Sequence, residues 1–203
     1  LQNYLISVTK EGENVFYGWG VYADLKNSNM NAVYLGEASL GLGRDYYQKV
    51  NEKNTEAIAE YQKYVASMLT ELGYKNADAA AKGIVEYEKS IAKTYLTNEQ
   101  SRDNTLQYNP QTMAELSALV KGADIPAYLK KVGVNTDKII IGELGYYKNF
   151  DKLVNAQNLP VIKDYLKFHM INGSASYLSE KLGDMKFNFF GKYLRGQQEQ
   201  RAL

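Results

Sequence analysis

The stretch that most limits the fold of this chain runs from Gly18 to Tyr47, where strand-forming residues give way to turn residues and then to glycines. Aromatic and β-branched residues suit a pleated, half-buried strand. They gather in Val15–Tyr17, Gly20–Ala23 and Ala32–Leu35. The polar segment Lys26–Asn29 lies between them and has turn chemistry, because Asn and Ser side chains bond their own backbone. The pattern predicts an antiparallel β-hairpin, which must pack on something else because two strands alone are marginal in water.

A glycine-punctuated loop follows the hairpin, and Arg44-Asp45-Tyr46-Tyr47 then opens a helix. Asp45 falls in the first turn, where a negative charge complements the helix dipole. We name Arg44, Asp45, Tyr46 and Tyr47 as candidate residues that anchor the loop or contact another domain. Glu37 and Asp45 flank the loop and are the carboxylates best placed for a site, although a structural role for Asp45 is favoured.

Apolar residues at three- and four-residue steps predict helices through most of the remaining chain. The expected helices run from a cap at Asn54 to Gly73, from a cap at Asn76 to about Leu96, and from a capping box at Thr112 and Glu115 to Gly122. Further helices are expected after Asp124 with Pro126 in the first turn, near Tyr146–Asn155, after Asn158, and from Tyr177 to Leu194. Gly173-Ser174 is expected to interrupt or bend the helix that Asn158 begins.

Two segments fit no helix. Residues 97–110 are polar and are expected to form an irregular surface connection. Lys138–Ile141 reads as a short strand or extended segment. The predicted fold is therefore mainly α, a multi-helix domain with a small antiparallel β-hairpin near the N-terminus. Residues 1–47 would hold a helix tail at Leu1–Lys10, the hairpin and the glycine loop, and residues 48–203 would form one helical lobe.

Composition excludes several classes of function. The net charge of +1 gives no electrostatic case for a nucleic-acid partner. No apolar run approaches the roughly 18 residues of a membrane span. Cysteine is absent and His169 is the only histidine, so this chain cannot assemble a thiolate site or a two-histidine zinc site. We predict no catalytic, cofactor-binding or metal-binding residue in it.

The remaining chemical groups favour structural roles. His169 sits at helical spacing between apolar neighbours and is expected to pack in the helix or lie at the surface. Glu86 and Glu88 diverge on a helix and are expected on a solvated face, although paired carboxylates could in principle hydrolyse glycosides. The chain has 18 tyrosines and one tryptophan, a composition that suits a core or an interface and also invites a sugar-binding reading.

Five blocks of sequence resemble the N-terminal half of the neprilysin-type zinc metallopeptidases. They are Asp24–Ser28 with Asn31–Gly36, then Leu40–Tyr47, Tyr108–Pro110 with Thr112–Leu116, Tyr165–His169, and Phe187–Gly191 with Leu194–Gln200. They occur in the family's order across nearly the whole chain. The chain departs from the family at Gly43, where a proline is usual, and its loop is one residue shorter.

The resemblance implies the non-catalytic helical lobe of a zinc endopeptidase, of a bacterial kind, that encloses the active-site chamber and restricts substrates to peptides. Zinc would be bound by an H-E-x-x-H segment and a later glutamate of the parent enzyme. The partners would be the catalytic domain of the same polypeptide and peptide substrates. An extracytoplasmic location is favoured, an exposed apolar patch is expected where the partner domain sits, and we expect a processed chain or part of a longer one. Two rival hypotheses are a stand-alone helical module that binds a glycan or peptide, and a family member that serves only as a scaffold.

Overall fold

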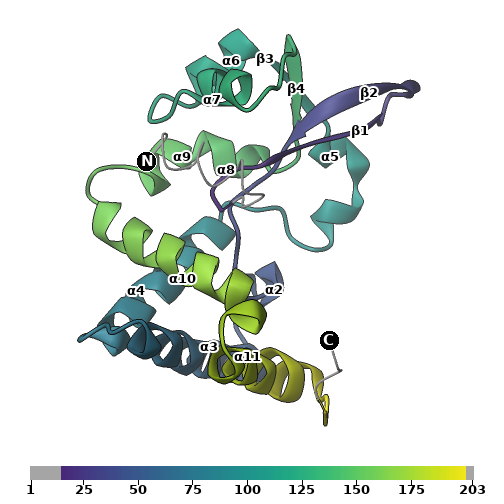
Figure 1. Cartoon of the computed structure of the whole chain (residues 1–203). Coiled ribbons are helices and arrows are strands. Elements are labelled where there is room, and N and C mark those ends of the chain that lie inside the picture. The colour runs from purple at the N-terminus through teal and green to yellow at the C-terminus, as the bar shows by residue number, and fades with distance from the viewer. Residues whose placement is uncertain (1–14, 200–203) are drawn as a thin grey trace. The chain divides into compact units, whose positions relative to one another are not determined.

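The structure of the protein, a computed structural model, describes residues 15–199. The fold is mainly helical and carries a small sheet with an antiparallel hairpin near the N-terminus, which confirms the predicted fold class (Figure 1). Two compact units can be distinguished. The first joins residues up to Leu40 with Ser90–Asn158, and the second joins Gly41–Lys89 with the chain from Leu159 on.

The first unit is built on a four-stranded sheet in the order β1-β2-β4-β3. Strand β1 (Trp19–Asp24) and strand β2 (Asn27–Leu35) form the predicted hairpin, with Trp19 opposite Leu35 and a register shift at Ala23/Asp24. Strand β4 (Lys138–Ile141) pairs parallel with β2, and strand β3 (Asn109–Thr112) pairs antiparallel with β4. The apolar run Ile139–Ile141 is fully buried, so its extended conformation is explained by its place inside the sheet.

Short helices accompany this sheet, and their aromatic residues form much of the core of the unit. The helices are η1 (Gln100–Arg102), α5 (Asn104–Gln107), α6 (Met113–Leu119), α7 (Ile125–Lys131), α8 (Leu144–Lys148) and α9 (Phe150–Leu153). The ring of Tyr17 meets Tyr128 edge-on at 4.8 Å and Phe150 at 5.9 Å. Such pairs add about 0.5–1.5 kcal/mol each beyond the area that they bury.

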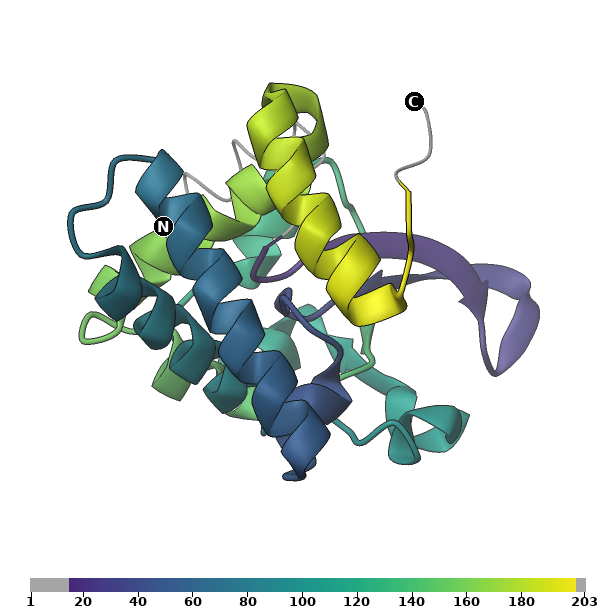
Figure 2. The ribbon, with the colours of Figure 1, turned by 90° about the horizontal axis from the view of Figure 1, so that it is seen from below.

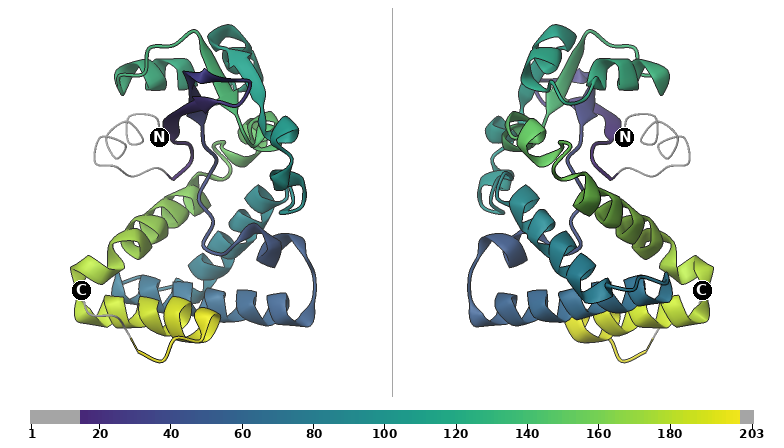
Figure 3. Two further views of the ribbon diagram at one scale, coloured as in Figure 1. Left: turned by 90° about the vertical axis from the view of Figure 1, so that its right-hand side faces the viewer. Right: turned by 90° about the vertical axis from the view of Figure 1, so that its left-hand side faces the viewer.

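The second unit is helical. It contains α2 (Arg44–Gln48), α3 (Glu52–Glu71), most of α4 (Ala77–Ala92), α10 (Leu159–Leu178), α11 (Glu180–Lys186) and the π-helix η2 (Phe187–Tyr193). Helices α11 and η2 lie along α3 (Figures 2 and 3). The rings of Tyr64 on α3 and Phe189 on η2 stack at 5.0 Å, which joins the two helices through an aromatic contact.

Several predicted helix ends are confirmed. Gly73 follows the end of α3 with φ of +79°, a conformation that glycine adopts without strain. Thr112 and Glu115 form both hydrogen bonds of a capping box at α6. Asp124 caps α7 through the N–H of Ala127, with Pro126 in the first turn.

Other local predictions are wrong. Asn51 rather than Asn54 caps α3; the side chain of Asn54 instead donates to the carbonyls of Asp45 and Lys49. Val15–Tyr17 is buried but forms no strand, and η1, α5 and β3 occupy much of residues 97–110. Gly173-Ser174 does not interrupt α10, which continues to Leu178, and a bend at these residues stays a prediction.

The proposed division of the chain after residue 47 stays a prediction, and the compact units cut the chain at Leu40, Lys89 and Asn158 instead. The helix tail expected at Leu1–Lys10 lies outside the described residues. No helix among residues 15–199 is long and apolar enough to cross a bilayer.

Candidate functional site

The four candidate residues that follow the glycine loop, Arg44–Tyr47, lie together on α2. Asp45 Oδ2 accepts from Lys49 Nζ at 3.1 Å, and the carbonyl of Asp45 accepts from Asn54 Nδ2 at 3.0 Å. Arg44 and Tyr46 are partly exposed, whereas Tyr47 is buried. Helix α2 thus turns one tyrosine inward, and its backbone is tied to α3 by Asn54.

Tyr47 is hydrogen-bonded to a buried carboxylate, that of Glu88. Its hydroxyl donates to Glu88 Oε2 at 2.5 Å and accepts the N–H of Leu42 at 3.1 Å. Tyr61 donates to Glu88 Oε1 at 3.1 Å, and His169 Nε2 lies 2.6 Å from the same oxygen. We call Tyr47, Tyr61, Glu88 and His169 the Glu88 cluster. It connects α2, α3, α4 and α10 within the second unit.

The electrostatics of the Glu88 cluster follow from burial. Burial first, and then the negative charge of Glu88, hold the pKa values of Tyr47 and Tyr61 well above the ordinary tyrosine value. Both hydroxyls therefore stay protonated and act as donors over the usual working range. A carboxylate with no exposed surface needs such partners, because an unpaired buried charge is very costly.

The expectation that Glu88 lies on a solvated face is therefore wrong, whereas Glu86 does face solvent and pairs with Lys89. The sequence held a signal for this difference. Glu88 stands between Ile84 and Ile91 on the apolar stripe of α4, at steps of four and three residues. His169 is packed as expected, with its ring 4.4 Å from that of Tyr165.

The Glu88 cluster does not fit a zinc ion. A zinc site needs three or four nitrogen, sulfur or carboxylate ligands. The chain has one histidine and no cysteine, and within residues 15–199 no group of three or more His, Asp or Glu side chains is placed to hold a metal. We therefore derive no metal chemistry from these residues.

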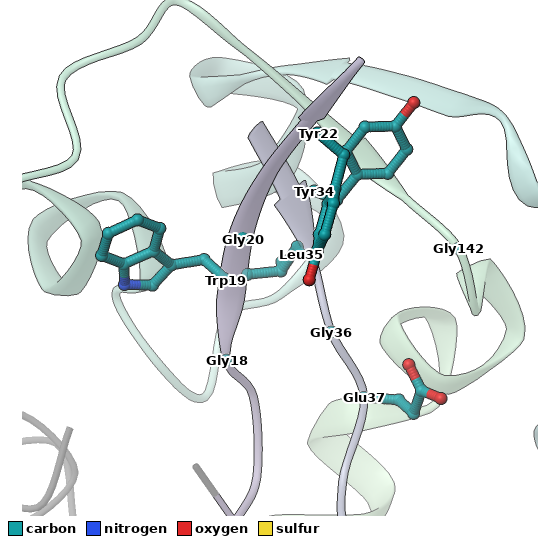
Figure 4. A pocket seen from close by; sticks show the side chains of 9 residues that line it. All are labelled: Gly18, Trp19, Gly20, Tyr22, Tyr34, Leu35, Gly36, Glu37 and Gly142. Atoms are coloured by element: carbon teal, nitrogen blue, oxygen red, sulfur yellow. The ribbon is translucent and has the colours of Figure 1, made fainter. Parts of the chain in front are cut away.

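The first unit carries a separate surface pocket of about 390 Å³ beside the hairpin (Figure 4). Backbone of Gly18, Gly20, Gly36 and Gly142 forms part of its lining. The rings of Tyr22 and Tyr34 lie 5.9 Å apart on one face of the hairpin, and Trp19 projects from the opposite face. Glu37, one of the two carboxylates favoured from the sequence, lies at the lower end of the pocket, whereas Asp45 belongs to the second unit.

Gly20 lies directly under the ring of Tyr22. A Cβ atom there would collide with the ring of Tyr22, with its hydroxyl at 2.9 Å. The tyrosine ring folds back over the strand where the glycine leaves room for it. The sequence showed aromatic residues and glycines side by side in this segment, but the pairing register was needed to place Tyr22 beside Tyr34.

Comparisons with known proteins agree with this fold. The N-terminal model of peptidase family M13 matches residues 1–202. Neprilysin-11 of Caenorhabditis elegans is 26% identical over 206 residues, covering 93% of this chain and 24% of the relative. Endothelin-converting enzyme 1 of Rattus norvegicus is 26% identical over 183 residues, covering 86% and 24%.

A solved structure agrees as well. The open state of the zinc metalloprotease Zmp1 of Mycobacterium tuberculosis superimposes with a TM-score of 0.90 at 25% identity, covering 100% of this chain and 32% of that protein. The chain thus spans about a quarter to a third of the length of these relatives. The match along nearly every residue shows that this chain belongs to peptidase family M13, as a neprilysin-like N-terminal region.

Proposed function

We propose that this chain is the non-catalytic helical lobe of a zinc endopeptidase, and that it encloses the active-site chamber and admits peptides rather than folded proteins. The catalytic domain of the same polypeptide would be its partner. Zinc would belong to that domain. An extracytoplasmic location of the parent enzyme is part of this proposal.

One observation carries the proposal: the M13 N-terminal model matches residues 1–202, while the chain covers only 32% of a zinc metalloprotease that it superimposes on. The described residues provide no zinc donor set of their own. The proposal therefore assigns the zinc chemistry to other parts of the parent polypeptide and an enclosing role to this chain.

The surface of the second unit offers a contact for a partner domain. Tyr177 and Leu178 at the end of α10 are exposed by 83% and 53%. Large apolar side chains side by side on a surface favour a covered state. We propose that the catalytic domain covers this end of α10, and that Asp45 and Tyr47 on α2 anchor the glycine loop, Tyr47 through the N–H of Leu42.

The test compares two substrates of one enzyme. The complete parent enzyme is given a short peptide and the same peptide inserted into a surface loop of a stably folded carrier protein. We expect chelator-sensitive cleavage of the peptide and of the unfolded carrier, and none of the folded carrier. Equal cleavage of folded and unfolded carrier would contradict the enclosing role.

A further inference from the structure

The second unit carries a pocket of its own, between α3 and the helices α11 and η2 that lie along it (Figure 2). Its volume is about 310 Å³, near the lower end of the range of small-molecule sites, roughly 300–1,000 Å³. Its α3 side runs from Glu60 to Ser67, about 10 Å along a helix that rises roughly 1.5 Å per residue. The pocket therefore has room for one small ligand rather than for a docked helix.

Aromatic rings form one wall of this pocket. Phe189 stacks with Tyr64 at 5.0 Å and with Tyr193 at 5.8 Å, and the ring planes are 9° and 19° apart. Tyr64 and Phe189 are buried, whereas Tyr193 is exposed by 43%. Stacking holds the Tyr193 ring in place while part of it stays open to solvent. Such a ring is a platform for a ligand that has a flat apolar face.

The π-helix explains how this wall acquires a polar group. Hydrogen bonds in a π-helix run between residues five apart, so such residues share a face. Asn188 and Tyr193 are five apart on η2, and both line the pocket. In an α-helix the neighbours are three and four apart, and these two side chains would diverge. The π-helix is rare and is frequent at functional sites, and here it brings an amide and a phenol to one pocket.

Several polar groups of the pocket are available to a ligand. The side-chain amide of Asn188 and the hydroxyl of Tyr193 form no hydrogen bond within residues 15–199. Glu60 Oε1 accepts from Lys63 Nζ at 2.5 Å, which leaves the second carboxylate oxygen and two ammonium N–H groups without a partner in the same part of the chain. Donors and acceptors thus lie side by side, and the charges of Glu60 and Lys63 cancel.

We propose that this pocket binds one pyranose ring of a neutral sugar. The apolar face of the sugar, which carries its C–H groups, packs on the ring of Tyr193. The sugar hydroxyls both donate and accept hydrogen bonds, and they pair with the amide of Asn188 and with the ion pair of Glu60 and Lys63. The inference goes beyond the proposed function and does not depend on it, because it concerns a surface of this chain alone.

Other classes of ligand fit this pocket less well. A charged ligand would meet no net charge, because Glu60 and Lys63 are the only charged side chains in the described lining and they pair with each other. An apolar ligand would cover the amide of Asn188 without giving it a partner, which is costly. A peptide strand needs free backbone N–H and C=O groups, whereas the pocket is lined by helices that use their own.

The test uses the 203-residue chain with methyl β-glucoside and methyl β-galactoside, followed by nitrogen-15 and proton NMR. We expect at least one glycoside to bind with a dissociation constant of about 1 mM, as usual ligand efficiencies imply for about a dozen heavy atoms. Sorbitol, which has the hydroxyls but no ring, should not bind. Magnetisation transfer from the bound sugar should reach both the Asn188 amide and the Tyr193 ring.

Three results with the unaltered chain would overturn the proposal. They are no binding of either glycoside at about 50 mM, far above the expected dissociation constant, binding of sorbitol or of the capped dipeptide acetyl-Gly-Gln-amide as tight as that of the glycosides, and a bound sugar that contacts Tyr193 but not Asn188. Cellotriose then distinguishes the source of the ring. Binding comparable to that of methyl β-glucoside assigns the pocket to the end of a glycan, and loss of binding assigns it to a free sugar.

Protein variants test each part of the pocket, with circular dichroism to show that each is folded. Tyr193→Leu should weaken glycoside binding about tenfold, and Tyr22→Leu on the first unit is its matched control. Asn188→Ala should weaken binding about three- to tenfold, the size of one hydrogen bond.

Lys63→Met should also weaken binding, whereas Lys89→Met should not, although Lys89 pairs with Glu86 at the same three-residue spacing on α4. Undiminished binding in the folded Tyr193→Leu variant would overturn the proposal.

Discussion

At the scale of single residues, the account depends on Glu88. Its two oxygens take hydrogen bonds from Tyr47 and Tyr61 and lie beside His169, and Glu88 itself has no exposed surface. Because each partner comes from a different helix, one carboxylate sets the spacing of α2, α3 and α10 around α4. Removing this carboxylate should therefore weaken the packing of all four helices in the second unit.

Glu88→Gln keeps the size of the side chain but puts a donor group where an acceptor is needed. We expect a loss of about 1–3 kcal/mol in the free energy of unfolding, measured by urea denaturation, because one buried donor is left without a partner. Glu86→Gln, two residues away on the exposed side of α4, is the matched control and should leave the midpoint unchanged. Equal effects of the two substitutions would contradict the structure.

Tyr47→Phe removes the hydroxyl that links the N–H of Leu42 to Glu88. The expected cost is about 1–3 kcal/mol, since both groups are buried and lose a hydrogen-bond partner. Hydrogen exchange of the Leu42 amide should also accelerate. Tyr46→Phe serves as the control because the neighbouring ring is partly exposed. A Leu42 amide that exchanges at the same rate in Tyr47→Phe would refute the link.

Residue patterns predicted helix-capping hydrogen bonds better than they predicted which polar side chains are buried. The capping box at Thr112 and Glu115 and the cap at Asp124 follow from side chains that bond backbone within three residues, so the sequence was sufficient. Glu88 and its partners are joined across separations of 27 to 81 residues, which no local pattern encodes. Its place on an apolar stripe was the only sign.

At the scale of elements, the glycine loop before α2 is held by contact rather than by unusual backbone angles. A Cβ atom on Gly41 would run into the ring of Tyr61, which bonds Glu88. A Cβ atom on Gly43 would meet only Tyr46, at 3.9 Å.

Gly41→Ala should therefore destabilise the protein by about 1–3 kcal/mol through overpacking. Gly43→Ala should be neutral or slightly stabilising, because Gly43 has φ of −59° and alanine adopts that angle freely. Thermal denaturation of both variants, side by side, measures the difference. If both shift the midpoint equally, the loop does not pack as described.

The elements also show where periodicity is insufficient. The hairpin was predictable because two segments rich in aromatic and β-branched residues lie within twenty residues of each other. Its turn was misplaced, since the chain turns at Leu25-Lys26 and the predicted turn residues Asn27–Asn29 belong to β2. Two features of the helices were not predicted: α10 continues through Gly173, and η2 has the wider turn of a π-helix. Both helices pack on α3 and α11, and such packing overrides local helix propensity. The sheet order was also beyond reach, since β4 pairs with β2 across a hundred residues.

At the scale of the whole molecule, the buried tyrosines predict how stability depends on pH. Burial raises the pKa values of six tyrosines above the ordinary value of 10.0, and they are Tyr17, Tyr47, Tyr61, Tyr64, Tyr87 and Tyr147. A group with a raised pKa in the folded state contributes its stability fully below its unfolded pKa. That contribution is lost as the pH rises through the folded value.

The tyrosines should therefore leave the urea midpoint constant from about pH 7 to pH 9 and lower it steeply above about pH 10. Tyrosinate absorbance should rise together with unfolding, because the buried hydroxyls cannot ionise in place. Tyrosines that all titrate near their ordinary value in a chain that stays folded would be inconsistent with this core.

The family of the chain was predictable from five ordered sequence blocks, and the fold class followed from helical periodicity together with one hairpin. The pocket was not predictable, because it depends on the register of β1 and β2. Sequence identifies residue types, whereas the distances that bring Tyr22, Tyr34 and Glu37 to one pocket come from the fold.

The most direct test of the central claim measures peptide hydrolysis by the 203-residue chain and by the polypeptide that also carries the catalytic domain, each with zinc and with a chelator. The account predicts chelator-sensitive hydrolysis by the longer polypeptide and none by the 203-residue chain, whatever the zinc concentration. Chelator-sensitive hydrolysis by the 203-residue chain alone would contradict it.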